Sequence, residues 1–139
     1  MNPEHKKVFA PPSADDFVRL RKAVAWGDTN AELASKSLNN SLFSVSIYEG
    51  KTIIGFGRVV GDGYMYFYIQ DVIVDPSYQG KGVGSVLMDE IESFLKRTVK
   101  PGSTVGLFAV KGKEKFYSKY GYLERTGDPM GKGMCKFPS

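Results

Sequence analysis

One stretch decides the fold of this 139-residue chain: Tyr66-Phe-Tyr-Ile-Gln-Asp-Val-Ile-Val-Asp-Pro-Ser-Tyr-Gln-Gly-Lys-Gly-Val-Gly-Ser-Val-Leu-Met-Asp-Glu-Ile-Glu-Ser-Phe-Leu95. Its first part is rich in β-branched residues and stops at Asp75-Pro76, where proline cannot continue a ladder of hydrogen bonds. Its last part repeats apolar residues at helical spacing, with charged residues between them. The stretch therefore predicts a strand, a loop and an amphipathic helix.

The loop between these elements is Gln79-Gly80-Lys81-Gly82-Val83-Gly84. Its three glycines leave room for a ligand to approach backbone N–H groups, which are unpaired and lie at the positive dipole end where a helix starts. Such a loop is a candidate cradle for a diphosphate. The spacing fits neither a nucleotide-triphosphatase phosphate loop nor a dinucleotide fingerprint, which needs glycine where Ser85 stands. The alternative is a connection whose glycines only relieve backbone strain.

Composition narrows the class of protein. A hydrophobic fraction of 42% in 139 residues predicts one folded domain over residues 1–139, and no apolar run is long enough to cross a bilayer. No signal peptide is recognisable and the one cysteine, Cys135, cannot form an internal disulfide, so we expect a cytosolic protein with Cys135 as a buried thiol. His5 is the only histidine, which excludes a histidine-based zinc site or catalytic triad, and no metal is expected.

The net charge of +4 is scattered, with no block of basic residues. This pattern fits a phosphate-bearing cofactor better than nucleic acid or a membrane surface.

The rest of the chain predicts two helices, then a three-strand meander, then alternating elements. A first strand is expected over residues 8–10, and Ser13 and Thr29-x-x-Glu32 are expected to cap the two helices. Arg19, Arg21 and Lys22 are expected to face outward or toward the end of the first helix.

Further strands are expected over residues 43–48, 52–60, 64–74, 104–110, 122–124 and 134–137, with a helix over 111–119. In the strand 52–60, alternation places Ile53, Gly55, Gly57 and Val59 on one face and Ile54, Phe56, Arg58 and Val60 on the other, and leaves Arg58 as either an edge charge or a pocket charge.

Two motifs resemble those of one known family. The pattern Gln79-x-x-Gly82-x-Gly84 and the segment Lys115-Phe-Tyr-Ser-Lys-Tyr-Gly-Tyr122 are similar to signature elements of the GNAT N-acetyltransferases, and the order of elements matches over nearly the whole chain. The resemblance implies an α+β, three-layer fold: a mixed, mostly antiparallel sheet with a splayed central parallel pair, flanked by helices. The run from Asp71 to Gly82 resembles the branch that contains plastid serotonin and protein acetyltransferases and their bacterial relatives.

The resemblance also implies an activity, namely direct transfer of acetyl from acetyl-CoA to an amine. In this family the first helical region lines one side of the acceptor cleft, so Trp26, beside that region, is either a core residue or a wall for an aromatic or apolar substrate. Arg58, as a pocket charge, would be the other candidate for substrate binding. Tyr117 matches the family's tyrosine and would donate a proton to the leaving sulfur. Asp71 is either the carboxylate that accepts the amine proton or a tie to the neighbouring strand. Several relatives carry an acidic residue where this chain has Val110, so a base at that position is absent.

The resemblance also implies which residues hold the cofactor. Val72, Ile73 and Val74 would pair with pantetheine through their backbone. The residues expected at the pyrophosphate are Gln79, Gly80, Lys81, Gly82, Val83 and Gly84, and Tyr117 is expected to contact the cofactor as well.

Three functions are compatible with the sequence. The first is acetylation of a small-molecule primary amine, the second is acetylation of protein lysines or N-termini, and the third is acyl-CoA binding without turnover. A homodimer is common in the family.

Overall fold

The computed structural model describes residues 2–139 and divides the chain into two compact units. The first ends at Leu107 and the second comprises Phe108–Ser139. Each unit is described by itself. The single domain expected over 1–139 stays a prediction.

The first unit is built on a five-stranded sheet in the order β1-β2-β3-β4-β5. The strands are β1 (His5–Val8), β2 (Phe43–Glu49), β3 (Thr52–Gly61), β4 (Tyr66–Val74) and β5 (Thr104–Leu107). Neighbouring strands are antiparallel except β4 and β5, which are parallel. A helix joins this last pair, as a parallel connection requires. The mixed sheet with one parallel pair, flanked by helices, is thus confirmed.

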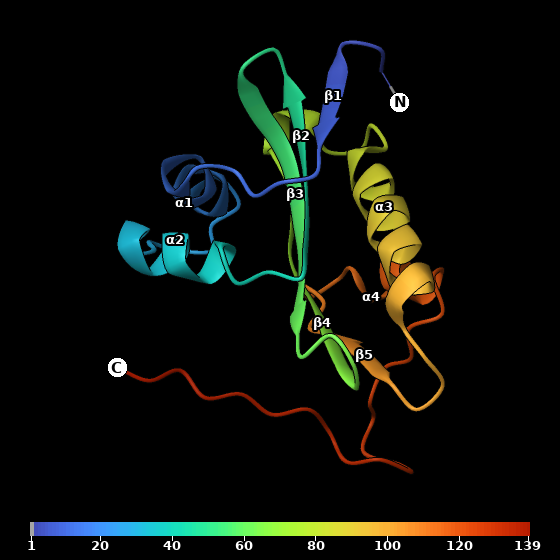
Figure 1. The fold of residues 1–139 in the computed structure, drawn as a ribbon. Helices are drawn as coiled ribbons and strands as arrows, with labels where there is room; N and C mark the ends of the chain where they lie inside the picture. The colour runs from blue at the N-terminus through green and yellow to red at the C-terminus, as the bar shows by residue number, and fades with distance from the viewer. Residues whose placement is uncertain (1) are drawn as a thin grey trace. The chain divides into compact units, whose positions relative to one another are not determined.

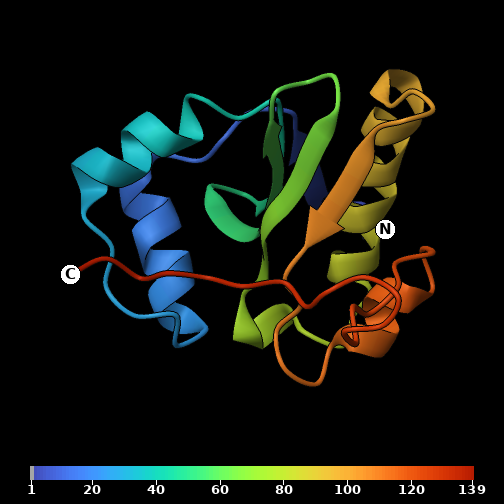
Figure 2. The same ribbon diagram turned by 90° about the horizontal axis from the view of Figure 1, so that it is seen from below.

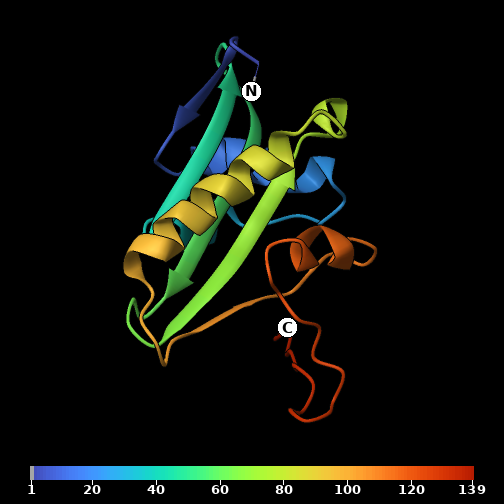
Figure 3. The same ribbon diagram turned by 90° about the vertical axis from the view of Figure 1, so that its right-hand side faces the viewer.

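Helices cover both faces of the sheet (Figures 1 and 2). Helices α1 (Ala14–Ala23) and α2 (Ala31–Leu38) lie on one face, and α3 (Val83–Thr98) lies on the other. Figure 3 shows α3 running along the strands. Gly55 and Gly57 of β3 allow this close approach, since a Cβ atom on either would come within 2.9 Å of a Val83 or Ile91 side chain of α3.

A bulge corrects one expectation about β3. Ile47 pairs with Gly55 while Tyr48 pairs with Ile53, which leaves Ile54 as an extra residue. An extra residue shifts the alternation of faces. Ile53 therefore packs with Phe56 in the core beneath α1 and α2, and not on the opposite face as strict alternation predicts.

The boundaries of the first elements differ from expectation by a few residues. Ser13 caps α1 as predicted, accepting a hydrogen bond from the Asp16 N–H. Asn30, one residue after the predicted Thr29, caps α2 by accepting from the Leu33 N–H. The first strand lies at residues 5–8 and not 8–10, because its backbone pairs with residues 46–49 of β2 before the chain reaches Pro11.

The second unit contains one short helix, α4 (Glu114–Ser118). The two strands expected over 122–124 and 134–137 are wrong, since no residue from 108 to 139 is in a strand. Glycine and proline, which are depleted in strands, recur through this segment at positions 127, 129, 131, 133 and 138. Cys135 is exposed, which corrects the expectation of a buried thiol.

Candidate active site

The glycine loop presents a row of unpaired backbone N–H groups. Gly80 and Gly82 have φ of +75° and +86°, a conformation that residues with a Cβ atom rarely adopt. Gly82 is the N-cap of α3 and supplies no side-chain cap, and the first helical bond runs from the Val86 N–H to the Gly82 carbonyl. Within residues 2–139, no backbone N–H of residues 80 to 85 donates a hydrogen bond. A helix start whose amides have no partner in the protein is a candidate site for an anion.

Beside the loop, the end of β4 is open along one edge. The parallel pairing with β5 ends where Ile69 meets Leu107, and β4 continues to Val74. Among the described residues, no strand pairs with residues 70–74 on that side. Gln79 donates a hydrogen bond from Nε2 to the Val74 carbonyl at 3.0 Å and so ties the loop to this strand end. The backbone of Val72, Ile73 and Val74 thus offers an edge to an extended, amide-bearing chain.

Asp71 lies in a bulge just before this open edge. Phe56 pairs with Ile73 and Arg58 with Gln70, so two residues of β4 oppose Gly57. Asp71 has φ of +58°, in the left-handed region that aspartate tolerates better than most residues. It is 3% exposed, and the bulge aims its carboxylate toward the α1 and α2 side of the sheet.

Two arginines bind the Asp71 carboxylate. Arg21 of α1 donates from Nη1 to Oδ1 at 2.7 Å, and Arg58 of β3 donates from Nε to Oδ2 at 2.8 Å. Gln70 adds a longer bond of 3.2 Å to Oδ1. Arg21 lies in the last turn of α1, as one of the two expectations for it states, but its guanidinium points inward to Asp71. Its only sequence signal is the helical spacing that places it four residues after the buried Phe17.

Arg58 and Trp26 both pack into the structure around this carboxylate. Arg58 is 6% exposed and also donates to the carbonyl and hydroxyl oxygens of Ser37 and to the Ser41 hydroxyl, so it links β4 to the end of α2. Trp26 is half-buried against the core, and the Arg21 guanidinium lies 5.3 Å from its ring centroid. Arg21, Ser37 and Ser41 were not predicted as parts of this network.

Tyr117 belongs to the second unit. It lies on α4, is half-buried, and contacts the Phe116 ring edge to face at 5.1 Å. Burial raises the pKa of Tyr117 above its ordinary value of 10.0, so the phenol keeps its proton at neutral pH.

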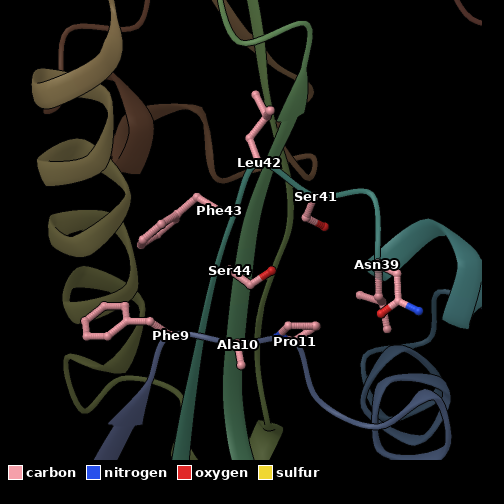
Figure 4. Close-up of a pocket in the computed structure, with 9 residues that line it drawn as sticks. Phe9, Ala10, Pro11, Asn39, Ser41, Leu42, Phe43 and Ser44 are labelled. Atoms are coloured by element: carbon pink, nitrogen blue, oxygen red, sulfur yellow. The ribbon is translucent and has the colours of Figure 1, made fainter.

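A cavity of about 300 Å³ opens at another part of the first unit (Figure 4). It lies between the segment after β1, the end of α2 and the start of β2. Phe43, which lines it, pairs with Val59 of β3, whereas Val74 beside the glycine loop pairs with Gly55. Four residues of strand span roughly 13 Å, so the cavity is separate from the loop.

None of the helices formed by residues 2–139 is both long and apolar enough to cross a membrane. In the same residues, no three His, Cys, Asp or Glu side chains gather as metal ligands would.

A candidate anion loop beside a strand edge that can pair with amides fits the two parts of coenzyme A, its diphosphate and its pantetheine. The fold and site thus define a coenzyme A-dependent acyltransferase. The GNAT acetyltransferase domain model matches residues 39–124, and the chain therefore belongs to the GNAT family. It is an acetyl-CoA-dependent N-acetyltransferase, as the two motifs predicted.

Individual relatives agree with this assignment. An uncharacterised N-acetyltransferase, ycf52-like, of Prochlorococcus marinus is 32% identical over 98% of this chain and 76% of its own length. The chloroplastic GCN5-related N-acetyltransferase 2 of Arabidopsis thaliana is 36% identical over 63% of this chain and 33% of its own.

Solved structures show the same fold. A probable acetyltransferase of Staphylococcus aureus is 34% identical, with a TM-score of 0.87 over 96% of this chain and 99% of that one. An acetyltransferase of Clostridium acetobutylicum, solved with acetyl-CoA, shares the fold at 19% identity and a TM-score of 0.68, over 88% of this chain and 92% of that one.

Proposed function

We propose that this enzyme moves acetyl directly from acetyl-CoA to the primary amine of a small molecule. The observation that carries the donor half of the proposal is the row of unpaired N–H groups at residues 80 to 85, next to the open edge of β4. The residues present fit coenzyme A, since an uncapped helix start suits its diphosphate and a free strand edge suits its amides.

In this proposal the chain holds the donor mainly with its backbone. The N–H groups from Gly80 to Gly84, including that of Val83, bind the diphosphate, and Lys81 adds a positive charge. Val72, Ile73 and Val74 pair with the pantetheine amides. Gln79 acts indirectly, because its side chain is already bonded to Val74 and sets the loop against the strand.

When bound, acetyl-CoA supplies an acetyl group activated as a thioester. The chain then has to hold the amine in line with it, and proximity of this kind can contribute about 7 kcal/mol or more. A backbone N–H near Val72 would stabilise the oxyanion. Tyr117 would donate the proton to the departing sulfur, a role supported by its motif and by a phenol that stays protonated. The attacking amine would release its proton to bulk water, from which the Tyr117 phenolate would be reprotonated.

For Asp71 we propose a positioning role and not that of a general base. Both of its oxygens already accept hydrogen bonds from arginines, and the carboxylate is buried. A base needs a lone pair directed at the amine, whereas this carboxylate faces two cations. Arg58 has four bonds within the protein, so we propose that it shapes the acceptor side without touching the acceptor. Trp26 remains a candidate wall for the acceptor, because the residue is only partly buried.

The cellular location of the enzyme and its partners are also proposals. We infer a cytosolic enzyme acting on a dissolved amine, without nucleic acid or membrane as a partner, because its basic charge is scattered and no basic block occurs.

The test is thiol release from acetyl-CoA with a panel of small amines and lysine-bearing peptides, comparing the wild type with Tyr117→Phe. Turnover with a small amine, reduced in the variant, is the expected result. Turnover only with peptides would replace the acceptor class with protein. Binding of acetyl-CoA without turnover on any amine or peptide would replace the enzyme with a binding module.

A further inference from the structure

Tyr78, the residue before the glycine loop, is bonded to the end of β2, which β3 separates from β4 in the sheet. It ends the short 3₁₀ helix η1 (Pro76–Tyr78), and its hydroxyl donates a hydrogen bond to Glu49 Oε2 at the end of β2. His5 also contacts Glu49, since His5 Nε2 lies 3.5 Å from Glu49 Oε1. The His5 side chain is only 7% exposed. The His5 and Tyr78 rings meet edge to face at 6.0 Å. Two strands thus hold the Tyr78 ring in place.

The Tyr78 ring contacts Lys81, the one positively charged side chain of the loop. Lys81 Nζ lies over the face of Tyr78, 5.6 Å from the ring centroid, although the Lys81 residue itself is exposed. An ammonium group within about 6 Å of an aromatic face is attracted to it. The hydrogen bond to Glu49 raises the pKa of Tyr78 above its ordinary value, so the phenol is a neutral hydrogen-bond donor at neutral pH.

From this arrangement we propose that Tyr78 is a positioning residue for the phosphates of coenzyme A, acting through Lys81. The inference rests on the proposed function of the loop. A free lysine loses much rotamer freedom when it binds a phosphate, and a ring that already confines the ammonium beside the loop removes part of that loss. Glu49 and His5 contribute by fixing the ring.

Calorimetric titration with coenzyme A tests the proposal through a double-variant comparison. Lys81→Met should weaken binding, and Tyr78→Leu should weaken it about two- to fivefold, the size of an exposed cation–π contact. In the Lys81→Met background, Tyr78→Leu should add no further loss. Tyr78→Leu should also lower the dependence of Kd on salt, which a general loosening of the fold would not do. Tyr66→Leu, at an exposed tyrosine at the start of β4, is the matched control.

The role of Tyr78 and the function of the loop are overturned by different results. If the two single-variant losses of coenzyme A affinity multiply in the double variant, or if Tyr78→Leu leaves Kd unchanged, the inference about Tyr78 is overturned while the function of the loop stands. A wild-type chain that does not bind coenzyme A overturns both. If Tyr78→Leu does not fold, Tyr78→Phe takes its place, because phenylalanine keeps the aromatic ring. The affinity of Tyr78→Phe for coenzyme A should still fall when Lys81 is replaced by methionine. An affinity that does not change on that replacement overturns the proposal.

Discussion

Replacing Asp71 with asparagine removes the negative charge that holds two guanidinium groups. Asparagine has nearly the same shape and tolerates φ of +58°, so the change adds little backbone strain. The substitution leaves the Arg58 guanidinium without its counter-charge, in a side chain that is only 8% exposed. Removing one partner of a buried pair costs about 3–5 kcal/mol.

The structure favours the lower end of that range. Arg58 keeps its bonds to Ser37 and Ser41, and Arg21 is partly exposed, so water replaces some of what it loses. We therefore expect Asp71→Asn to lower the free energy of unfolding by about 3 kcal/mol, a large share of the roughly 5–15 kcal/mol typical of a native protein.

Urea denaturation measures this change. With a slope of about 1–3 kcal/mol per molar urea, the midpoint should fall by about 1–3 M. Asp28→Asn is the matched control, because Asp28 forms an ion pair with Lys22 at 3.6 Å but is 88% exposed, and such a pair contributes about 0–1 kcal/mol. A change below about 1 kcal/mol for Asp71→Asn would refute the reasoning.

Activity of the folded Asp71→Asn enzyme separates the two roles of Asp71. A general base contributes an acidic limb to the pH dependence of turnover, and its removal abolishes that limb. A positioning residue acts through geometry, so the variant should turn over more slowly with the same pH profile. Loss of the acidic limb would restore Asp71 as the base.

Three further predictions concern the loop, the proposed acid and a turn. Gly82→Ala should abolish measurable calorimetric binding of acetyl-CoA, whereas Gly102→Ala, equally strained at φ of +99° and also facing open space, should leave Kd unchanged. Tyr117→Phe should lower kcat by about 10²- to 10⁴-fold with little change in KM for acetyl-CoA, and because burial raises the pKa of Tyr117 above 10.0, the wild-type activity should not fall from loss of this proton until the pH exceeds 10.0. Backbone N–H groups of residues 64–66 lower the pKa of Asp62 below 3.8, so its contribution to stability is present above the unfolded pKa and is lost as pH falls through the folded pKa. The difference in Tm between wild type and Asp62→Ala should therefore shrink in acid, and a difference that persists at the lowest pH would contradict this explanation.

The glycine loop is predictable from sequence because its signals are local. A β-branched run, Asp-Pro, three glycines and helical spacing follow one another within thirty residues, and each restricts the backbone at its own position. The same holds for Ser13, which caps the helix that directly follows it.

The network around Asp71 is not predictable in this way. Its bonds join residues 13 and 50 positions apart, and they depend on which face each side chain occupies. Bulges change that face by inserting one residue, and neither the bulge in β3 nor the bulge in β4 leaves a mark in the period-two pattern. Arg58 shares a face with apolar neighbours, and that pattern is compatible with an edge charge and with a pocket charge alike. Arg21 lies near the end of its helix as expected, but nothing local to α1 indicates that its guanidinium reaches Asp71.

Strand β4 carries two anchors that differ in what they hold. Val74 accepts the Gln79 side chain and so fixes the donor loop, while Asp71, roughly 10 Å earlier along the strand, fixes α1 and α2 through Arg21 and Arg58. A change at Gly82 acts on the first anchor's loop and should appear in donor affinity. A change at Asp71 acts on α1 and α2, the helices that we propose line the acceptor side, and should appear in kcat and acceptor KM, with donor Kd nearly unchanged. Equal losses of donor affinity in both variants would mean that the strand transmits the disturbance along its length, and that the two halves of the site are not separable.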